Sequence, residues 1–490
     1  MLALLLMVLM TQATACTVSQ NPLSGRSRAY GYTWEQERQL GQQADQEIVV
    51  AMGLYDDADV QAYVERIGQR VLAESHLRRP DADPEFRETP FTFRVIDSPV
   101  VNAFALPGGF VYVTRGLLSH LNNEAQLAVV LGHEIVHIAG RHASRQALQA
   151  QLGQLGVIGG AVLGQAVLGG QAGRSILNLG STAAGLLLLS YGRDAERESD
   201  QHGVAYAAQA GYDAGEGAEF FVSLRRLGEE SGGGLPSFLS THPDPGEREQ
   251  TIRAMAAEWR QQVQMNLVEE QGYLNQIEGI VVGQDPRQGF VQDEMFYHPQ
   301  LRFRFPVPRN FLVDNQPSQV AMVERQNQQA AIIFAIASGA SSASAAAAQF
   351  GNQQGVNVQD NRAVSVNGLP AHALAATATL EGGQEIGLLT YFIEHGDNVY
   401  YFLGYSVLSV FGQYRDTFQR TMTGFAPETS QRILSVQPAR LRLVRANRAA
   451  PFSSFVGGDL PGGLTAEELA IMNQVELNEQ ISAGTTLKLP

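Results

Sequence analysis

Residues 122–151 are NNEAQLAVVLGHEIVHIAGRHASRQALQAQ, a strongly helical segment that contains His133-Glu134-Ile135-Val136-His137. Positions i and i+4 share one face of a helix, so both imidazoles can bind the same Zn²⁺ ion. Glu134 projects beside them and can take a proton from water at that metal. This H-E-x-x-H pattern predicts a catalytic zinc centre with one ion per chain, His133 and His137 as ligands, and Glu134 as the general base.

A catalytic zinc ion also needs a third protein ligand and an open position. The best candidate is Glu196 in the run Glu196-Arg197-Glu198-Ser199-Asp200. On a second helix, Glu196 and Asp200 are one turn apart, so one carboxylate could bind zinc while the other accepts an N–H from a ligand histidine. The alternative is a solvated acidic face, because Glu198 is also present.

Four motifs follow one another in the order found in one peptidase family. They are NAFALPGGFVYVTRGLL (102–118), LGHEIVHIAGRH (131–142), YGRDAERESDQHG (191–203) and STHP (240–243). The set resembles the zinc metallopeptidase family that contains HtpX, the CAAX prenyl endopeptidases and BepA. Because four clear transmembrane helices are missing from the sequence, the resemblance favours the soluble, periplasmic, BepA-like branch.

This resemblance implies roles for single residues. In a zincin-like core, His133, His137 and Glu196 would bind zinc and Glu134 would be the base. Asp200 matches a family aspartate that supports a metal ligand without binding the metal itself. Arg193, which we also expect among the residues that support the ligands, matches a family arginine that usually follows a serine, whereas Gly192 stands there in this chain. A substrate would lie extended along a sheet edge, paired by backbone hydrogen bonds, at Asn102, Ala103 and Phe104.

Two further histidines belong to these motifs. His142 lies five residues after His137 and is rotated off the metal face, so we expect a structural or supporting role for it. His242 lies in the STHP loop. In the BepA-like branch the matching histidine can fill the open position of the zinc and hold the enzyme latent. A histidine that merely lines the site is the alternative.

The N-terminus has the pattern of an exported protein. An apolar run precedes TQATAC, so residues 1–15 are predicted as a signal peptide. Cys16 resembles the lipidated cysteine of a bacterial lipoprotein, which would anchor the chain to the outer membrane and place it in the periplasm. The alternative is an ordinary signal peptide with a chance cysteine. Residues 16–32 are polar and are predicted as a tether.

We predict an α+β chain of three folded units. A mainly helical zincin-like domain with a small sheet spans 33–265, a linker 266–295, an α+β module of unknown role 296–427, and a small βαβ-type module 435–490. The last unit resembles LysM modules, which commonly bind peptidoglycan, although a plain packing module is an equal alternative. The Gly- and Ala-rich residues 152–190 are predicted as close-packed helices or a lid rather than a membrane span.

The composition narrows the class of partner. The formal net charge is −15 and no Lys/Arg-rich run is present, so nucleic acid is a poor partner. We expect a zinc metalloendopeptidase that cleaves misfolded or misassembled cell-envelope proteins, with outer-membrane assembly machinery as a further partner. The rival prediction is a latent zinc-containing periplasmic chaperone or cell-wall-associated assembly factor. A glycan-binding protein with a dead peptidase is disfavoured, because every catalytic position is filled.

Overall fold

The computed structural model describes residues 17–154, 191–230, 242, 245–380, 383–458 and 460–490. The predicted signal peptide, Cys16 and most of the segment 152–190 lie outside these residues. Within the described ranges, every helix is too short or too polar to span a lipid bilayer. Helices and sheets are mixed throughout, which agrees with the predicted α+β class.

The N-terminal domain is a helical body around a small sheet. Its helices are α2 (Trp34–Met52), α3 (Ala58–Ala73), α4 (Pro84–Arg87), α5 (Arg115–His120), α6 (Glu124–Ala139), α7 (His142–Gln154), α11 (Arg193–Gln209), α12 (Gly217–Glu230), α14 (Pro245–Trp259) and α15 (Glu270–Ile277). Its strands are β1 (Thr17–Gln20), β2 (Ser27–Tyr30), β3 (Thr92–Ile96), β4 (Ala103–Leu106) and β5 (Phe110–Thr114). Strand β5 ends at Thr114, because the Thr114 hydroxyl caps α5 by accepting from the Leu117 N–H at 3.0 Å.

The helix that carries the H-E-x-x-H motif is the centre of this domain. Asn123 begins α6 by accepting a hydrogen bond from the Gln126 N–H, and every residue from Glu124 to Ala139 is buried. Apart from Glu124, Gln126 and the three motif residues, α6 is apolar, and a helix that is apolar on most sides belongs in the interior. One side of α6 packs on α11, where a Cβ on Gly132 would lie 2.7 Å from the Gly203 carbonyl oxygen. Two glycines thus let the two helices approach closely.

The small sheet has the order β3-β5-β4, with β3 parallel and β4 antiparallel to β5. β4 is therefore an edge strand, as the sequence predicts for residues 102–104. Its four residues are buried between α6 on one face and α2 on the other. The predicted turn Pro107-Gly108-Gly109 joins β4 to β5.

The predicted tether is a folded hairpin instead. β1 and β2 pair antiparallel from Thr17 to Tyr30, and Asn21 and Tyr30 are fully buried against the N-terminal domain. A polar segment can be buried in this way because its polar groups find partners far along the chain, such as the Gly140 carbonyl oxygen that accepts from Asn21.

The predicted linker 266–295 is also partly folded. It contains α15, whose Tyr273, Leu274 and Ile277 are buried in the core of the N-terminal domain. The Tyr273 hydroxyl donates to the Leu118 carbonyl oxygen at 2.7 Å. The spacing of apolar residues on α15 therefore reflects its packing against the N-terminal domain, which a simple linker would not make.

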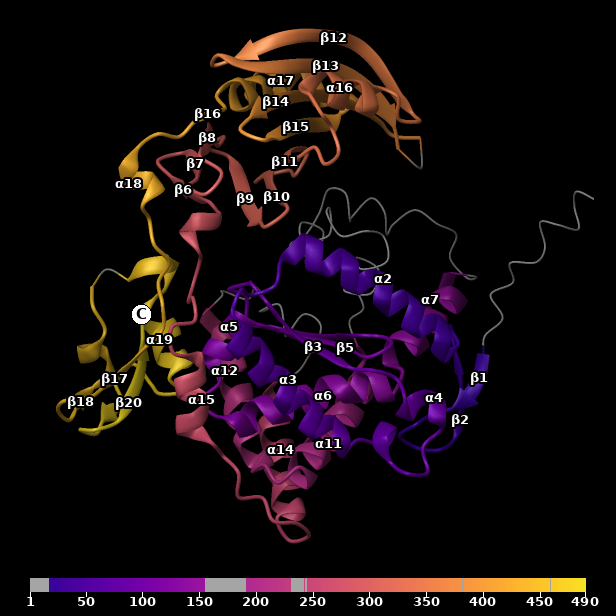
Figure 1. Cartoon of the computed structure of the whole chain (residues 1–490), viewed down its shortest axis with the longest axis vertical. Coiled ribbons are helices and arrows are strands. Elements are labelled where there is room, and N and C mark those ends of the chain that lie inside the picture. Colours follow the sequence, from indigo (N-terminus) through magenta and orange to yellow (C-terminus); the bar gives the residue numbers. More distant parts are fainter. Residues whose placement is uncertain (1–16, 155–190, 231–241, 243–244, 381–382, 459) are drawn as a thin grey trace, which may run out of the picture.

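The second unit is built on a seven-stranded antiparallel sheet of order β12-β13-β14-β15-β11-β10-β9, beside a four-stranded sheet of order β16-β8-β7-β6. Figure 1 shows it above the N-terminal domain. Its strands are β6 (Phe290–Gln292), β7 (Met295–His298), β8 (Phe303–Pro306), β9 (Phe311–Gln316), β10 (Gln319–Glu324), β11 (Ala330–Ile336), β12 (Val356–Val366), β13 (Leu369–Thr379), β14 (Glu385–His395), β15 (Asn398–Val407) and β16 (Ala426–Pro427). Helix α16 (Ala343–Gly351) lies between β11 and β12, α17 (Leu408–Thr423) lies between β15 and β16, and α18 (Gln431–Leu434) follows β16.

The C-terminal unit shares the core of the N-terminal domain. It consists of β17 (Arg442–Arg445), β18 (Ala450–Pro451), α19 (Ala466–Met472), β19 (Gln480–Ile481) and β20 (Thr486–Leu489). Leu469 and Leu487 join the same apolar cluster as α6. The fully buried Lys488 donates to the carbonyl oxygens of Ser119 and Leu121 at the end of α5. This unit is thus fastened beside α5 and α12, as Figure 1 also shows.

Candidate metal centre and active site

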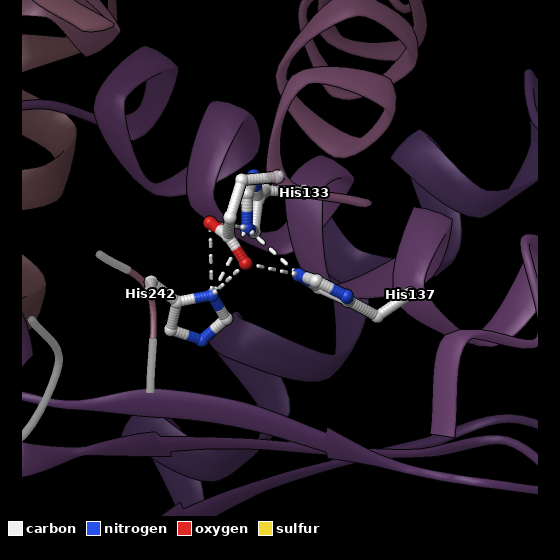
Figure 2. Close-up of side chains that lie close together, drawn as sticks. His133, His137 and His242 are labelled. Atoms are coloured by element: carbon white, nitrogen blue, oxygen red, sulfur yellow. Dashed lines mark hydrogen bonds and ion pairs between the residues drawn. The ribbon is translucent and has the colours of Figure 1, made fainter. Parts of the chain in front are cut away.

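The side chains of four residues converge beside α6. His133 and His137 lie one helical turn apart, α11 brings Glu196, and the segment before α14 brings His242. One donor atom from each lies within 4.8 Å of the others, and all four residues are buried. Figure 2 shows the three histidine rings turned toward one point. The structure therefore brings together the predicted ligands and the predicted fourth histidine.

The donor set fits a metal ion. His133 Nδ1 lies 2.9 Å from Asp200 Oδ1, so this nitrogen donates its proton and Nε2 keeps a lone pair. His137 Nε2 faces His133 Nε2 at 2.9 Å, and the Glu196 carboxylate oxygens lie 3.4 and 3.5 Å from these two nitrogens. Imidazole nitrogens and a carboxylate that point at one another can hold a cation between them, and this N/N/O set suits zinc.

The general base predicted from the sequence lies at the same place. Glu134 is fully buried, and neither of its carboxylate oxygens has a hydrogen-bond partner among the described residues. His242 Nε2 lies 3.6 Å from Glu134 Oε1. Burial raises the pKa of Glu134. A buried carboxylate with unused oxygens is suited to receive a proton from a reacting molecule.

The histidines and carboxylates shift each other's pKa values. Burial opposes the charge on Glu196, but His242 and His133 outweigh it and hold the pKa of Glu196 far below its usual range. Burial and Arg248 disfavour a charged His133, yet hydrogen bonds with Asp200 and Glu196 raise its pKa to about 9. Burial and the charge of His133 keep the pKa of His137 well below its ordinary value. The cluster thus holds anionic oxygens against imidazoles, as a cation site requires.

Arg248 is a residue of this site that the sequence did not reveal. Its guanidinium bonds both oxygens of Asp200, lies 3.2 Å from Glu196 Oε2 and stacks over the Phe221 ring at 4.2 Å. It lies in the first turn of α14, six residues after His242. The only signal in the sequence was that a helix begins directly after the STHP loop, so that a side chain from its first turn would lie near His242.

Arg193 does not take the place that the family resemblance gave it. It is exposed at the first position of α11 and makes no ion pair with Glu196 or Asp200 in the described part of the chain. Arg248 pairs with both carboxylates instead. The physical reason is that Arg193 begins the helix and faces outward, whereas α14 packs directly on α11.

His142 contacts a predicted ligand. Its Nδ1 lies 2.9 Å from His137 Nδ1, and its Nε2 lies 3.0 Å from Glu198 Oε2. The Tyr191 ring stacks on His137 with the ring centroids 4.0 Å apart. Glu198, which the sequence allowed as part of a solvated face, therefore belongs to the support of the cluster.

On the substrate side, β4 is the edge strand of its sheet. Ala103 and Phe104 are buried, and Asn102 is half-buried. The Asn102 Oδ1 atom has no hydrogen-bond partner among the described residues. Within the described part of the chain no strand pairs with the outer edge of β4, which can therefore bond another strand.

Comparison with known proteins identifies the domain. Residues 58–256 match the model of Peptidase family M48. The chain is 29% identical over 248 residues to the beta-barrel assembly-enhancing protease of Escherichia coli K12, a match that covers 49% of this chain and 48% of that protein. It is 32% identical over 211 residues to a Vibrio cholerae protein that is provisionally given the same name, covering 42% and 40% of the two chains.

A eukaryotic relative matches the same domain. Identity to the mitochondrial metalloendopeptidase OMA1 of Schizosaccharomyces pombe is 29% over 248 residues, covering 50% of this chain and 67% of that protein. The chain spans less than half of the length of the Escherichia coli and Vibrio cholerae relatives. The family match and the cluster of His133, His137 and Glu196 concern the same residues, and residues 58–256 of this chain are a Peptidase family M48 domain.

Proposed function

We propose that this protein is a zinc-dependent metalloendopeptidase. The observation that carries the proposal is the convergence of His133, His137 and Glu196 beside the buried Glu134, whose oxygens accept no hydrogen bond from the described residues. Two imidazoles and a carboxylate are a common ligand set of hydrolytic zinc. The M48 match and the metalloendopeptidase names of its relatives support the same reaction.

Different residues of the chain would have different roles in peptide hydrolysis. Zinc, when bound, would supply Lewis acidity toward a carbonyl oxygen and toward water. Glu134 would accept a proton from the attacking water and deliver it to the leaving amine, a task for which its raised pKa is suited. Asp200 would fix the His133 ring with the proton on Nδ1, and Arg248 would hold Asp200 in turn.

The substrate would bind as an added strand. The outer edge of β4 can hydrogen-bond an extended polypeptide, with Asn102 just before the strand. Such pairing uses the backbone and reads little sequence, which suits misfolded or misassembled proteins of the cell envelope. The name of the Escherichia coli relative, which concerns beta-barrel assembly, supports this class of substrate and outer-membrane assembly machinery as a partner.

His242 supports a second candidate function. Its Nδ1 lies 3.1 Å from Glu196 Oε1 and 3.3 Å from His133 Nε2, so its ring occupies the space where a water or a substrate would meet the ligands. As a fourth ligand it would hold the enzyme off, and the protein would act as a latent chaperone or assembly factor until this segment moves.

The chain termini carry two further parts of the proposal. Lipidation of Cys16 would place the anchor one residue before β1, at the periplasmic side of the outer membrane. The C-terminal unit would act as a LysM-like module that binds peptidoglycan. A groove of about 570 Å³ between β17 and residues 455–457 and 460–461 supports this role, with Arg440, Arg442 and Phe455 in its wall.

One experiment tests the substrate class. Envelope proteins would be compared by quantitative proteomics between cells with the wild-type protein and cells with Glu134→Gln. A substrate should accumulate, and its fragments should vanish, in the variant only. Identical envelope proteomes would contradict an enzyme that acts there.

A further inference from the structure

The hairpin of residues 17–32 is attached to the end of the metal-binding helix. The Asn21 side-chain amide donates to the Gly140 carbonyl oxygen at 3.2 Å, where α6 ends. The backbone N–H groups of Gly31 and Tyr32 donate to the Ser144 carbonyl and hydroxyl oxygens at 3.1 Å, at the start of α7. The hairpin therefore contacts both helices that flank residue 141.

Arg141 is the centre of this contact. It adopts a left-handed backbone with φ of 56°, a conformation that is unfavourable for a residue with a side chain. Its buried guanidinium donates to Glu37, to the Ser19 hydroxyl and to the Tyr32 carbonyl oxygen, and lies 3.9 Å from the centre of the Tyr30 ring. These contacts hold the turn from α6 to α7 in one shape, and so fix where the next residue, His142, points.

The position of His142 determines which ring nitrogen of His137 carries the proton. For His137 Nε2 to offer a lone pair to a metal, the proton of the neutral ring must be on Nδ1. That proton needs an acceptor, and the atom opposite it is His142 Nδ1 at 2.9 Å. His142 must then carry its own proton on Nε2, where Glu198 Oε2 accepts it at 3.0 Å. Glu198 thus sets both tautomers.

The hairpin reaches Glu198 as well. Arg28 in β2 lies 3.4 Å from Glu198 Oε2 and 3.5 Å from Oε1, in a partly buried ion pair. Arg28 and Arg141 are therefore two separate links from the hairpin to His142.

The other ligand histidine, His133, is supported in a similar way. His133 Nδ1 bonds Asp200 directly, and Arg248 holds that carboxylate. Each ligand histidine of α6 is thus linked by hydrogen bonds to a carboxylate of α11, and an arginine pairs with that carboxylate. The difference is that the path from His137 runs through His142 to Glu198 and ends in the hairpin.

We propose that the N-terminal hairpin is part of the support of the metal centre. Docked through Arg141 and Arg28, it holds His142 and Glu198 in the arrangement that leaves His137 Nε2 free to bind the metal. Arg28, Glu198 and His142 are positioning residues. The docking of the hairpin and the binding of the metal stabilise each other.

The first test measures zinc affinity by competition with a chromophoric chelator. Glu198→Ala should weaken zinc binding about 10- to 100-fold, as expected when the partner of a ligand histidine is removed. Arg28→Gln should weaken it about two- to fivefold, since the ion pair is partly exposed. The matched controls are Asp194→Asn on the exposed face of α11 and Arg26→Gln in the hairpin, and both should bind zinc like the wild type. Unchanged affinity in Glu198→Ala overturns the proposal.

Two readouts separate positioning from general damage. In long-range ¹H–¹⁵N spectra of the zinc-loaded wild type, His142 should carry its proton on Nε2, and a proton on Nδ1 would overturn the tautomer assignment. The absorption bands of the cobalt(II)-substituted protein should shift in Glu198→Ala and in His142→Gln, but not in the two controls. If Glu198→Ala does not fold, Glu198→Gln replaces it.

The second test uses wild-type protein only. Coupling between two sites is reciprocal, so zinc must strengthen the docking of the hairpin by the factor by which docking strengthens zinc binding. Hydrogen exchange at the Gly31 and Tyr32 amides should slow about tenfold or more when zinc is added to the metal-free protein. The β17–β20 pair is the reference for a distant two-stranded sheet. Equal slowing, or none, at both places overturns the coupling.

This inference rests on the proposed function only in taking His137 as a metal ligand. A wild-type protein that binds no metal would contradict the proposed function itself. A wild-type protein that binds zinc tightly, with unchanged affinity in Glu198→Ala, would contradict the inference and leave the proposed function standing.

Discussion

Arg248 donates to both carboxylate oxygens of Asp200, from Nε to Oδ2 at 2.8 Å and from Nη2 to Oδ1 at 2.5 Å. The two residues are 48 positions apart and come from α14 and α11. Both are buried, so this bidentate pair is shielded from water and from salt. The same arginine lies 3.2 Å from Glu196, and it therefore balances two of the carboxylates around the metal centre.

Removing this arginine should destabilise the fold. In Arg248→Gln, two carboxylates would remain buried without their cationic partner, and the free energy of unfolding should fall by about 3–5 kcal/mol. Urea unfolding of the metal-free protein measures it. The control is Arg253→Gln on the same helix, a half-exposed residue paired with Glu219, which should change stability by about 1 kcal/mol or less. Equal losses in both variants would contradict the assignment.

Glu134→Gln should keep zinc and fold but lose proteolysis. The side chain is buried, accepts no hydrogen bond from the described residues and does not need to bind the metal, so an amide of the same shape can replace it. Cleavage of casein should fall by at least about 100-fold, because the proton acceptor is gone. Metal analysis and thermal unfolding provide the control. Cleavage near the wild-type rate would exclude Glu134 as the base.

Glu196→Ala should abolish tight zinc binding. Its carboxylate lies 3.4 and 3.5 Å from the two ligand nitrogens, and no neighbouring carboxylate reaches both. The measurement is zinc content after dialysis against a weak chelator. Glu198→Ala is the comparison, and it should bind zinc more weakly than wild type yet more tightly than Glu196→Ala. The reverse order would show that the wrong carboxylate was assigned.

His242→Ala should raise basal activity if His242 is a fourth ligand in the resting state. With about nine tenths of the molecules plugged, removing the plug would raise cleavage of an unfolded protein about tenfold, with zinc retained. The competing role is that His242 steadies the oxyanion of the reacting carbonyl. A fall of about 100-fold with zinc retained would establish that role instead.

The stability that Glu198 contributes should depend on pH. Its pKa is about 2 in the folded protein, below the value near 4.5 of an unfolded chain, because it accepts from His142. A lowered carboxyl pKa stabilises the fold above pH 4.5, and this contribution is lost as the pH falls toward 2. In urea unfolding of the metal-free protein, the difference between wild type and Glu198→Gln should shrink from pH 6 to pH 3. A constant difference would contradict the pKa shift.

Local sequence was sufficient for the elements around the metal. The spacing of His133 and His137 follows from the helical repeat, and Glu196 and Asp200 are one turn apart for the same reason. A strand at Ala103 was also predicted, because the clear turn Pro107-Gly108-Gly109 follows it. Such features depend on residues within one or two turns of each other, so a sequence pattern can indicate them.

Errors arose where distant partners determine the structure. Residues 17–32 have the composition of a tether, but Asn21 finds its acceptor 119 residues away at Gly140. Residues 270–277 follow the expected end of the domain, yet Tyr273 bonds Leu118 across 155 residues. The sequence contains no periodic signal for such contacts, because their free energy comes from packing that exists only in the folded chain.

What the sequence by itself indicated is the chemistry proposed for the centre: which imidazoles and carboxylates can meet a metal ion, and which carboxylate would move a proton. The tertiary structure alone decided what holds them. It placed Arg248 rather than Arg193 against the carboxylates, and it connected His137 through His142 to the hairpin. Ligand spacing is a property of one helix, whereas the orientation of a ring depends on hydrogen bonds between segments that only the fold brings together.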